Sequence, residues 1–312
     1  MIPLKVEAAE LYKTTGTDPH QLNDPNVAHL VIHHNKVLSS HLLPGLEVEV
    51  KELEDGISAV MVVKEGAVFE KQVHLCFGML PENGIQRIIL DIRVEKNAEI
   101  SVLAHCTFPN AVDVKHIMDA VIHLEEGAKY TYLEKHIHGD KGGVKVYPRA
   151  RVMLEKSARF KTEFELLQGR VGLIEIDYET TCREQSVMEM TARINGTADD
   201  RIIIRETGYL VGEGSRGVLT SRVALRGRTR AEVHNKLVAE AAYARGHVDC
   251  KEIIQDQGVA IAIPMVEVRH PKAQVTHEAA IGSVDSKQLE TLMSRGLTEE
   301  EGTDLIIQGL LS

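Results

Sequence analysis

The stretch AKYTYLEK (Ala128–Lys135) has the same pattern as AEISVLAH at Ala98–His105 and ARFKTEFELL at Ala158–Leu167. The three segments are evenly spaced along the chain. Each begins with a small residue and then broadly alternates between apolar and polar side chains, with frequent Val, Ile, Thr and Tyr. Because neighbouring side chains of a β-strand point to opposite faces, the three segments predict strands with one buried face.

Strand starts of this kind recur from Ala128 onward, at intervals of roughly 12 to 16 residues. Two strands per turn give a coil of about 27 to 31 residues, and self-similarity at such a period is typical of a solenoid. No helical segments separate the strands, so each strand is expected to pair with its equivalent one turn away. The pattern therefore predicts a mainly β protein built as a flattened parallel β-helix.

A β-sandwich or an antiparallel barrel is the alternative, because those folds also contain short strands at similar spacing. The chain has few Pro residues, and Asn-Gly or Asp-Gly hairpin turns are rare, with exceptions at Asp55–Gly56 and Asn195–Gly196. Both observations favour the solenoid.

The solenoid is expected to occupy residues 28–283. Residues 1–27 precede it as a helical and irregular segment, with a short helical pattern that ends near Gly16 and turns at Thr17–Asn26. Residues 284–312 follow it as a helical segment.

Capping residues define two helices in this last segment. Asp285 is a good N-cap for the first helix, which Gly296 closes, and Thr298 with Glu301 forms a capping box for the second. The two helices either cap the last coil or bind a partner in a groove. Their apolar side chains include Leu289, Leu292, Met293, Leu305 and Ile306.

Composition limits the classes of partner and the cellular compartment that are expected for this chain. The net charge of −10 argues against nucleic acid or an anionic membrane surface as the partner. The N-terminus lacks the apolar core of a signal peptide, and no apolar run is long enough to span a membrane. Four Cys residues form no CxxC pair, which indicates a cytoplasmic protein in a reducing compartment.

Cys250 and His277 are separated by one turn of the predicted coil. Aligning the chain by that interval stacks Cys250 on His277, while Glu278 faces the opposite side of its strand. A thiolate, an imidazole and a carboxylate suit iron, zinc or copper(I). The alternative is that Cys250 is a small buried core residue and that His277 is only hydrogen-bonded.

Other metal-ligand residues are weaker candidates. Cys76, Cys106 and His136 follow one another at equal intervals of one coil, so they are expected to form a column of buried positions. The stretch His136–Gly143 resembles a metal-binding loop, but it is predicted at a turn and therefore as a solvated loop. Cys182 has no evident partner.

The stretch QVTHEAAIGSVDSKQLETLMSRGLTEEEGTDLIIQGLL (Gln274–Leu311) resembles the C-terminal signature of the SufB/SufD family of iron–sulfur cluster assembly proteins. The resemblance implies a right-handed parallel β-helix with a small C-terminal helical domain. It implies a scaffold that carries a transient iron–sulfur cluster, with Cys250, His277 and Glu278 taking part. The Glu after His277 is similar to the SufB branch, because SufD proteins have Gly there.

The same resemblance implies a complex with SufC, an ABC-type ATPase that binds the C-terminal helices. It places Leu289, Leu292, Met293, Leu305 and Ile306 at that contact. The chain is short, like archaeal or minimal members, so a homodimer is expected in place of the bacterial SufB–SufD heterodimer, with the β-helices joined edge to edge. A flavin remains an open possibility in such complexes.

The chain is expected to be a scaffold rather than an enzyme. It has no GxxxxGK[ST] loop, so ATP hydrolysis is expected in the partner ATPase. Two alternatives stay open: a structural or regulatory partner of the ATPase without cluster ligands of its own, and a β-helix carbohydrate-active enzyme. The second would need clustered carboxylates, and the sequence offers no evident pair.

Overall fold

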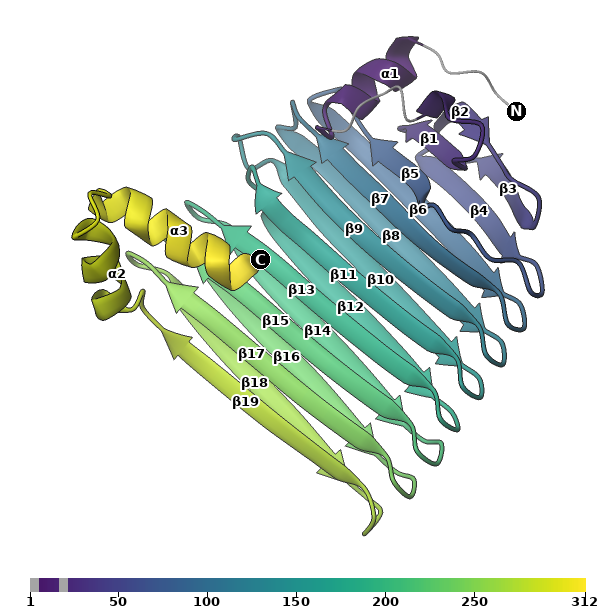
Figure 1. Cartoon of the computed structure of the whole chain (residues 1–312). Coiled ribbons are helices and arrows are strands. Elements are labelled where there is room, and N and C mark those ends of the chain that lie inside the picture. Colours follow the sequence, from purple (N-terminus) through teal and green to yellow (C-terminus); the bar gives the residue numbers. More distant parts are fainter. Residues whose placement is uncertain (1–5, 17–21) are drawn as a thin grey trace.

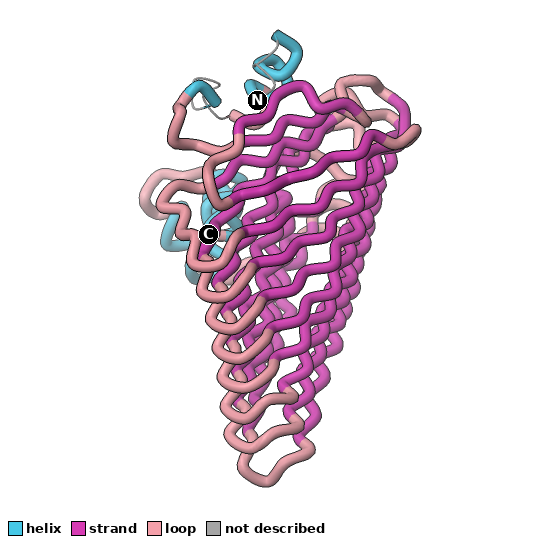
Figure 2. Tube along the Cα trace, turned by 90° about the vertical axis from the view of Figure 1, so that its right-hand side faces the viewer, coloured by secondary structure: helices cyan, strands magenta, loops and turns pink. Residues whose placement is uncertain are grey.

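The computed structural model describes residues 6–16 and 22–312, so the first part of the predicted Thr17–Asn26 turns lies outside the described residues. Within them the chain forms two large sheets that stack as two layers of one solenoid (Figures 1 and 2). The first helix is α1 (Val6–Lys13), as the helical pattern ending near Gly16 predicts. Among the described residues no helix is long and apolar enough to cross a membrane.

The first sheet, called sheet A, contains ten strands within the described residues. They are β1 (His29–His33), β2 (Lys36–His41), β5 (Val73–Gly78), β7 (Glu99–Phe108), β9 (Lys129–His138), β11 (Arg159–Gln168), β13 (Val187–Gly196), β15 (Arg216–Leu225), β17 (Arg245–Ile254) and β19 (Gln274–Gly282).

The facing sheet, called sheet B, contains nine strands in the same part of the chain. They are β3 (Leu46–Glu52), β4 (Gly56–Val63), β6 (Asn83–Val94), β8 (Asp113–Leu124), β10 (Val144–Leu154), β12 (Gly172–Cys182), β14 (Arg201–Leu210), β16 (Arg230–Ala239) and β18 (Val259–Val268).

The parallel β-helix is confirmed, and the sandwich and barrel alternatives are wrong. Successive strands alternate between the two sheets, and each strand from β4 onward pairs in parallel with its equivalent one coil away. One coil carries Lys129 to its partner Arg159, and near the C-terminus a coil shorter by one residue carries Arg245 to Gln274. Among the described residues, the departure from this pattern is in the N-terminal coil, which has the antiparallel pairs β1–β2 and β3–β4.

A repeating turn sets the length of each coil. A residue with positive φ, such as Asn97, Gly127 or Ser157, is followed by a small, fully buried residue, such as Ala128 or Ala158. The backbone N–H of Ala128 donates to the carbonyl of Glu125, which closes a tight turn. The small residue fits where the chain enters the core, and this explains why these repeats begin with Ala, or with Ser at Ser186 and Ser215.

Alternate side chains of both sheets point inward and form one continuous core along the solenoid. In β9 the inward residues are buried while their neighbours are exposed or half-buried. The in-register stacking creates columns in which one residue of each coil lies over its equivalent in the next. One such column runs through Cys106, His136 and Leu166, as predicted.

The C-terminal helices α2 (Ser286–Met293) and α3 (Glu299–Leu311) begin at the predicted caps. Ile307 and Leu311 pack against Ala224 of β15 and Ile253 at the end of β17, and Asp304 pairs with Arg226 at 2.6 Å. The helices therefore lie beside the ends of the strands (Figure 1). The interpretation that they cap the last coil is wrong, because α3 packs on β13 and β15 rather than across β19.

The C-terminal end of the solenoid is open. Strand β19 ends sheet A and strand β18 ends sheet B. Side chains on both faces of these two strands are exposed or only partly buried, because no further coil covers them. The outward face of β18 carries Val259, Ile261, Ile263 and Met265, each 38 to 48% exposed.

Candidate functional site

Cys250 lies on the inward face of β17, next to the open end of the solenoid. It is fully buried. The side-chain amide of Asn235 in β16 donates to Cys250 Sγ at 3.6 Å and to Ser221 Oγ at 2.8 Å. Burial, with the charge of nearby Glu252 as a lesser cause, raises the pKa of the Cys250 thiol to about 12.

Two buried carboxyl groups accompany this thiol. Glu252 follows Cys250 by two positions on the same face of β17, and Glu206 lies on β14 beside Asn235. Both residues are 2% exposed. Both Glu252 oxygens and Glu206 Oε2 have no hydrogen-bond partner in the part of the chain that the structure describes. Burial raises the pKa of Glu252 to about 7 and that of Glu206 to about 8.

The sequence reasoning missed both carboxyl groups. The position of Glu252 could have been predicted from its spacing, because residues two positions apart on a strand share a face. No sequence pattern could have predicted the position of Glu206, because it enters from an earlier coil of the opposite sheet.

The predicted stacking of Cys250 on His277 is wrong by two positions. Cys250 lies opposite Ala279, and His277 lies opposite Val248. The cause is the repeating turn: Ala273 is equivalent to the buried Ala244, one coil earlier, and not to Gly246.

A shift of two positions keeps the face of each side chain, so His277 still shares the inward side with Cys250. The two are diagonal neighbours whose Cα atoms lie about 8 Å apart, given strand spacing and rise. His277 is exposed, because β19 is the last strand of its sheet. Glu278 lies opposite Asp249 on the outward face and pairs with Lys251 at 3.4 Å. Within one chain these residues gather at one end of the solenoid but do not form one ligand set.

A second cluster lies in the first half of the solenoid. Cys106, His116, Glu134 and His136 are buried, and one potential ligand atom from each lies within 4.8 Å of the others. Cys106 of β7 and His136 of β9 are register partners, Glu134 precedes His136 on the same face of β9, and His116 reaches in from β8 of the opposite sheet.

Burial controls the protonation of this cluster. It lowers the pKa of His116 and of His136 to about 3, so both imidazoles are neutral. It raises the pKa of Glu134 to about 7 and that of Cys106 well above its usual value.

Two predictions about the first half of the chain are corrected. His136 and His138 are not in a solvated loop, because β9 extends to His138 and buries both rings. Cys76 is not in the column with Cys106: it lies opposite His105 and faces the opposite side of its sheet, in a small cluster with Tyr12 of α1. The coil there is shorter by one residue than the spacing of the two Cys residues, and a shift of one residue reverses the face.

Buried polar side chains lie between the two clusters. The hydroxyl of Tyr178 in β12 donates to Glu134 Oε2 at 3.3 Å. Tyr178 and Glu206 are register partners, and Glu206 is in turn the register partner of Asn235, which contacts Cys250. The core of this protein is therefore polar along one line rather than uniformly apolar.

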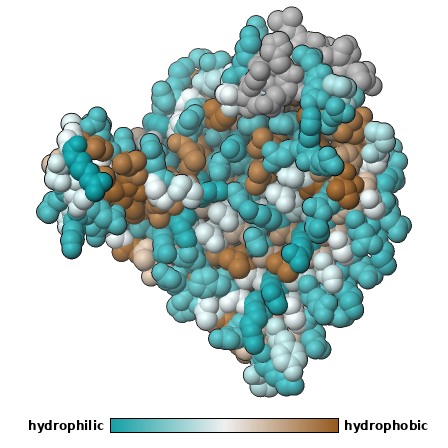
Figure 3. All heavy atoms as spheres, in the orientation of Figure 1, coloured by the Kyte–Doolittle hydropathy of each residue, from teal (hydrophilic) through white to brown (hydrophobic). Residues whose placement is uncertain are grey.

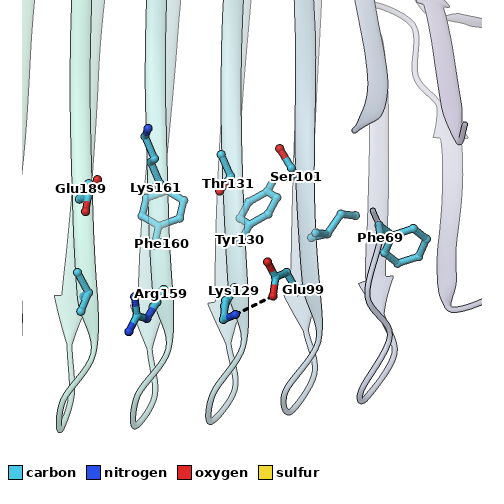
Figure 4. A pocket seen from close by; sticks show the side chains of 12 residues that line it. Phe69, Glu99, Ser101, Lys129, Tyr130, Thr131, Arg159, Phe160, Lys161 and Glu189 are labelled. Atoms are coloured by element: carbon cyan, nitrogen blue, oxygen red, sulfur yellow. Dashed lines mark hydrogen bonds and ion pairs between the residues drawn. The ribbon is translucent and has the colours of Figure 1, made fainter. Parts of the chain in front are cut away.

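A depression on sheet A, near the starts of its strands, is a weaker candidate for a functional site (Figure 4). Tyr130 and Phe160 line it together with charged residues from the outward face. Lys129 pairs with Glu99 at 2.7 Å, and both side chains are about half exposed. Solvated ion pairs of this kind are common on a sheet surface and do not indicate a site.

The residues predicted to contact a partner lie on both helices, α2 and α3. Leu289 holds the helices together, since a Cβ on Gly302 would come within 2.8 Å of it. Leu292, Leu305 and Ile306 line a shallow groove between the helices, and Met293 and Leu305 are 44% and 48% exposed. Hydrophobic atoms gather over these helices in Figure 3.

Comparison with known proteins identifies a family. Residues 81–310 match the family model described as SUF system FeS cluster assembly, SufBD core domain. An iron-sulfur cluster assembly SufBD family protein of Methanocaldococcus jannaschii is 34% identical over 98% of this chain and 97% of its own length. One of Pyrococcus horikoshii is also 34% identical, over 97% of this chain and 92% of its own length.

A shorter match reaches the iron-sulfur cluster assembly protein SufB of Bacillus subtilis, 26% identical over 42% of this chain and 35% of that protein. The family match and the two archaeal relatives cover most of the solenoid and the C-terminal helices. The chain therefore belongs to the SufBD family of iron–sulfur cluster assembly proteins.

Proposed function

We propose that this protein is a SufB-like scaffold on which iron and sulfide are assembled into a nascent cluster at the open end of the solenoid. Cys250 supplies the thiolate ligand. One observation carries the proposal: a buried thiol lies beside the unpartnered carboxyl of Glu252, one coil from an uncovered edge. His277 and Glu278, on the last strand, extend the ligand set toward whatever binds that edge.

A single chain brings too few ligands together for a cluster, which usually takes four. A second protomer completes the set by joining its open edge to this one. The unpaired strand edges of β18 and β19 support this arrangement, because such edges pair readily with another chain. The exposed apolar stripe on β18 supports it as well. We therefore propose a cytoplasmic homodimer, where other members form heterodimers.

The second partner is a SufC-type ABC ATPase that binds α2 and α3. Its contact includes Leu292, Leu305 and Ile306, which line the groove, together with Met293, while Leu289 maintains the helix pair. The partner hydrolyses ATP, and this chain acts as a scaffold and not as an enzyme. Nothing in the described geometry favours a flavin.

Anaerobic reconstitution with ferrous iron and sulfide, with the ATPase present, tests the proposal. Wild type is expected to gain the visible charge-transfer absorption of a cluster, and Cys250→Ala to lose it. Cys182→Ala is the matched control, because Cys182 is equally buried but lies in sheet B, away from the open end. A Cys250→Ala variant that holds as much iron and sulfide as wild type would refute the assignment of Cys250 as a cluster ligand.

The regulatory alternative makes the opposite prediction. A protein that only controls the ATPase would remain colourless in wild type while still binding its partner. A β-helix carbohydrate-active enzyme is less well supported, because the carboxyls of Glu134, Glu206 and Glu252 are buried inside the solenoid, where a polysaccharide does not reach.

A further inference from the structure

The four-residue cluster Cys106, His116, Glu134 and His136 has the composition of a closed metal site. It contains two imidazoles, one thiol and one carboxyl, drawn from three successive strands β7, β8 and β9. All four side chains are buried, and their potential ligand atoms lie within 4.8 Å of one another. Ligand atoms of a tetrahedral zinc ion lie roughly 3.3 to 3.8 Å apart, so small side-chain rotations would suffice.

Hydrogen bonds orient His136 toward the centre of the cluster. His138 Nδ1 lies 3.2 Å from the carbonyl of Arg170, which can only accept, so His138 donates there and its Nε2 accepts. His136 Nδ1 lies 3.1 Å from that Nε2 and therefore donates to it. In a neutral ring this leaves a lone pair on His136 Nε2, which faces Glu134 Oε1 at 2.7 Å.

A lone pair and a carboxyl oxygen at that distance share a proton. A metal ion would replace this proton once the two atoms move apart to the separation of zinc ligands. This orienting chain has the form seen at metal sites, where a ligating His donates its second ring N–H to an outer group. The Tyr178 hydroxyl, which donates to the other oxygen of Glu134, fixes the carboxyl in the same way.

His116 provides an independent observation. Its side chain is fully buried, and neither of its ring nitrogens has a hydrogen-bond partner among residues 6–16 and 22–312. A buried polar group without a partner is costly, and such groups usually have a partner such as a water molecule or an ion. His116 faces the Cys106–Glu134–His136 group across the core, so an ion there would satisfy it.

We propose that Cys106, His116, Glu134 and His136 bind one divalent first-row metal ion of borderline softness, zinc or ferrous iron. The donor set suits these ions, and four protein ligands complete a tetrahedral site. The thiolate and the carboxylate neutralise the charge of the ion, which lowers the cost of burying it.

This site goes beyond the proposed function and is separate from the Cys250 region. Glu134 and Cys250 lie in one column of sheet A, through Phe164, Ala192 and Ser221. Four strand spacings separate them, or about 19 Å. A cluster assembled at Cys250 and an ion held at Cys106 therefore do not share ligands.

Cobalt(II) tests the site, because a cobalt–thiolate bond gives a near-ultraviolet charge-transfer band. Protein stripped of metal by a chelator under reducing conditions is titrated with Co²⁺ in two arms, one folded and one refolded with the ion. Wild type is expected to bind one ion per chain with the band in at least one arm. Zinc and ferrous iron are then compared by displacement of the cobalt.

Variants assign the ligands. Cys106→Ala is expected to remove the band, and His116→Leu to weaken binding more than about tenfold, since even outer groups change metal affinity by that factor. Cys182→Ala and Cys250→Ala are controls that keep the band. Cys250→Ala also separates this proposal from the proposed function, because it removes the cluster and leaves the cobalt site.

The His116→Leu variant also distinguishes loss of metal binding from misfolding. Without metal it is expected to melt no lower than wild type, because it removes two unpartnered nitrogens, and to lack the metal-induced rise in melting temperature. Absence of stoichiometric cobalt in both arms of wild type would overturn the proposal. So would a band that survives in Cys106→Ala, or equal metal affinity in His116→Leu and wild type.

Discussion

Replacing Glu206 by Gln is expected to stabilise the protein, and increasingly so as the pH rises. Glu206 is 2% exposed, and burial raises its pKa from 4.5 to about 8. Between these two values the unfolded chain has already ionised Glu206 while the folded protein still holds its proton. Ionisation therefore favours the unfolded state, and the stability of the wild type falls throughout this pH window.

The magnitude follows from the size of the window. Each pH unit between the unfolded-state and folded-state pKa values changes the free energy of unfolding by about 1.4 kcal/mol. At pH 5 the penalty from Glu206 is about 1 kcal/mol, and at pH 7 it is about 3 kcal/mol. Gln has a similar shape and does not ionise, so Glu206→Gln removes the pH-dependent part.

Urea denaturation of wild type and variant at pH 5, 6, 7 and 8 measures this difference. Glu175→Gln is the matched control, because Glu175 lies half-exposed on the outward face of the neighbouring strand β12 and its replacement is expected to change little at any pH. Infrared spectra of the wild type should show a protonated carboxyl at pH 7 that the variant partly loses. A stability difference that is the same at pH 5 and pH 8 would refute the reasoning.

Three further substitutions probe the packing and the two proposed interfaces. Leu166→Ala removes a fully buried side chain from the Cys106–His136 column. It is expected to cost about 2 to 5 kcal/mol, measured as a lower urea midpoint, and a loss below about 1 kcal/mol would contradict the packing described. Ile263→Lys places a charge on the outward face of β18, where the side chain is 40% exposed. It should leave the melting temperature unchanged and shift the protein from dimer to monomer in light scattering, and a persistent dimer would argue against this interface. Leu305→Glu should likewise keep the fold, because Leu305 is 48% exposed, and should abolish co-purification with the ATPase. Retention of the ATPase would move its contact elsewhere, and Gln308→Glu, on the same helix and also exposed, is the matched charge control.

The repeat, the strands and most side-chain faces could be predicted from the sequence alone, although Cys76 faces the side of its sheet opposite to the predicted one. The alternation in Ala128–Lys135, and in its copies one coil away, is a local property, because it depends only on which side chains are apolar and which are polar. The caps at Asp285 and Thr298 are equally local, and the structure has both. The stacking of Cys106 on His136 followed from their spacing, because the coil there has the expected length.

The register between coils and the contacts across the core could not be predicted, because they depend on how the whole chain packs. Cys250 and His277 were misaligned because the coil length depends on which small residue is buried at the turn, and Ala244 rather than Gly246 occupies that position. His116 joins Cys106, and Glu206 approaches Cys250, from the opposite sheet. No sequence period relates residues of facing sheets, because their proximity depends on how the two layers are packed.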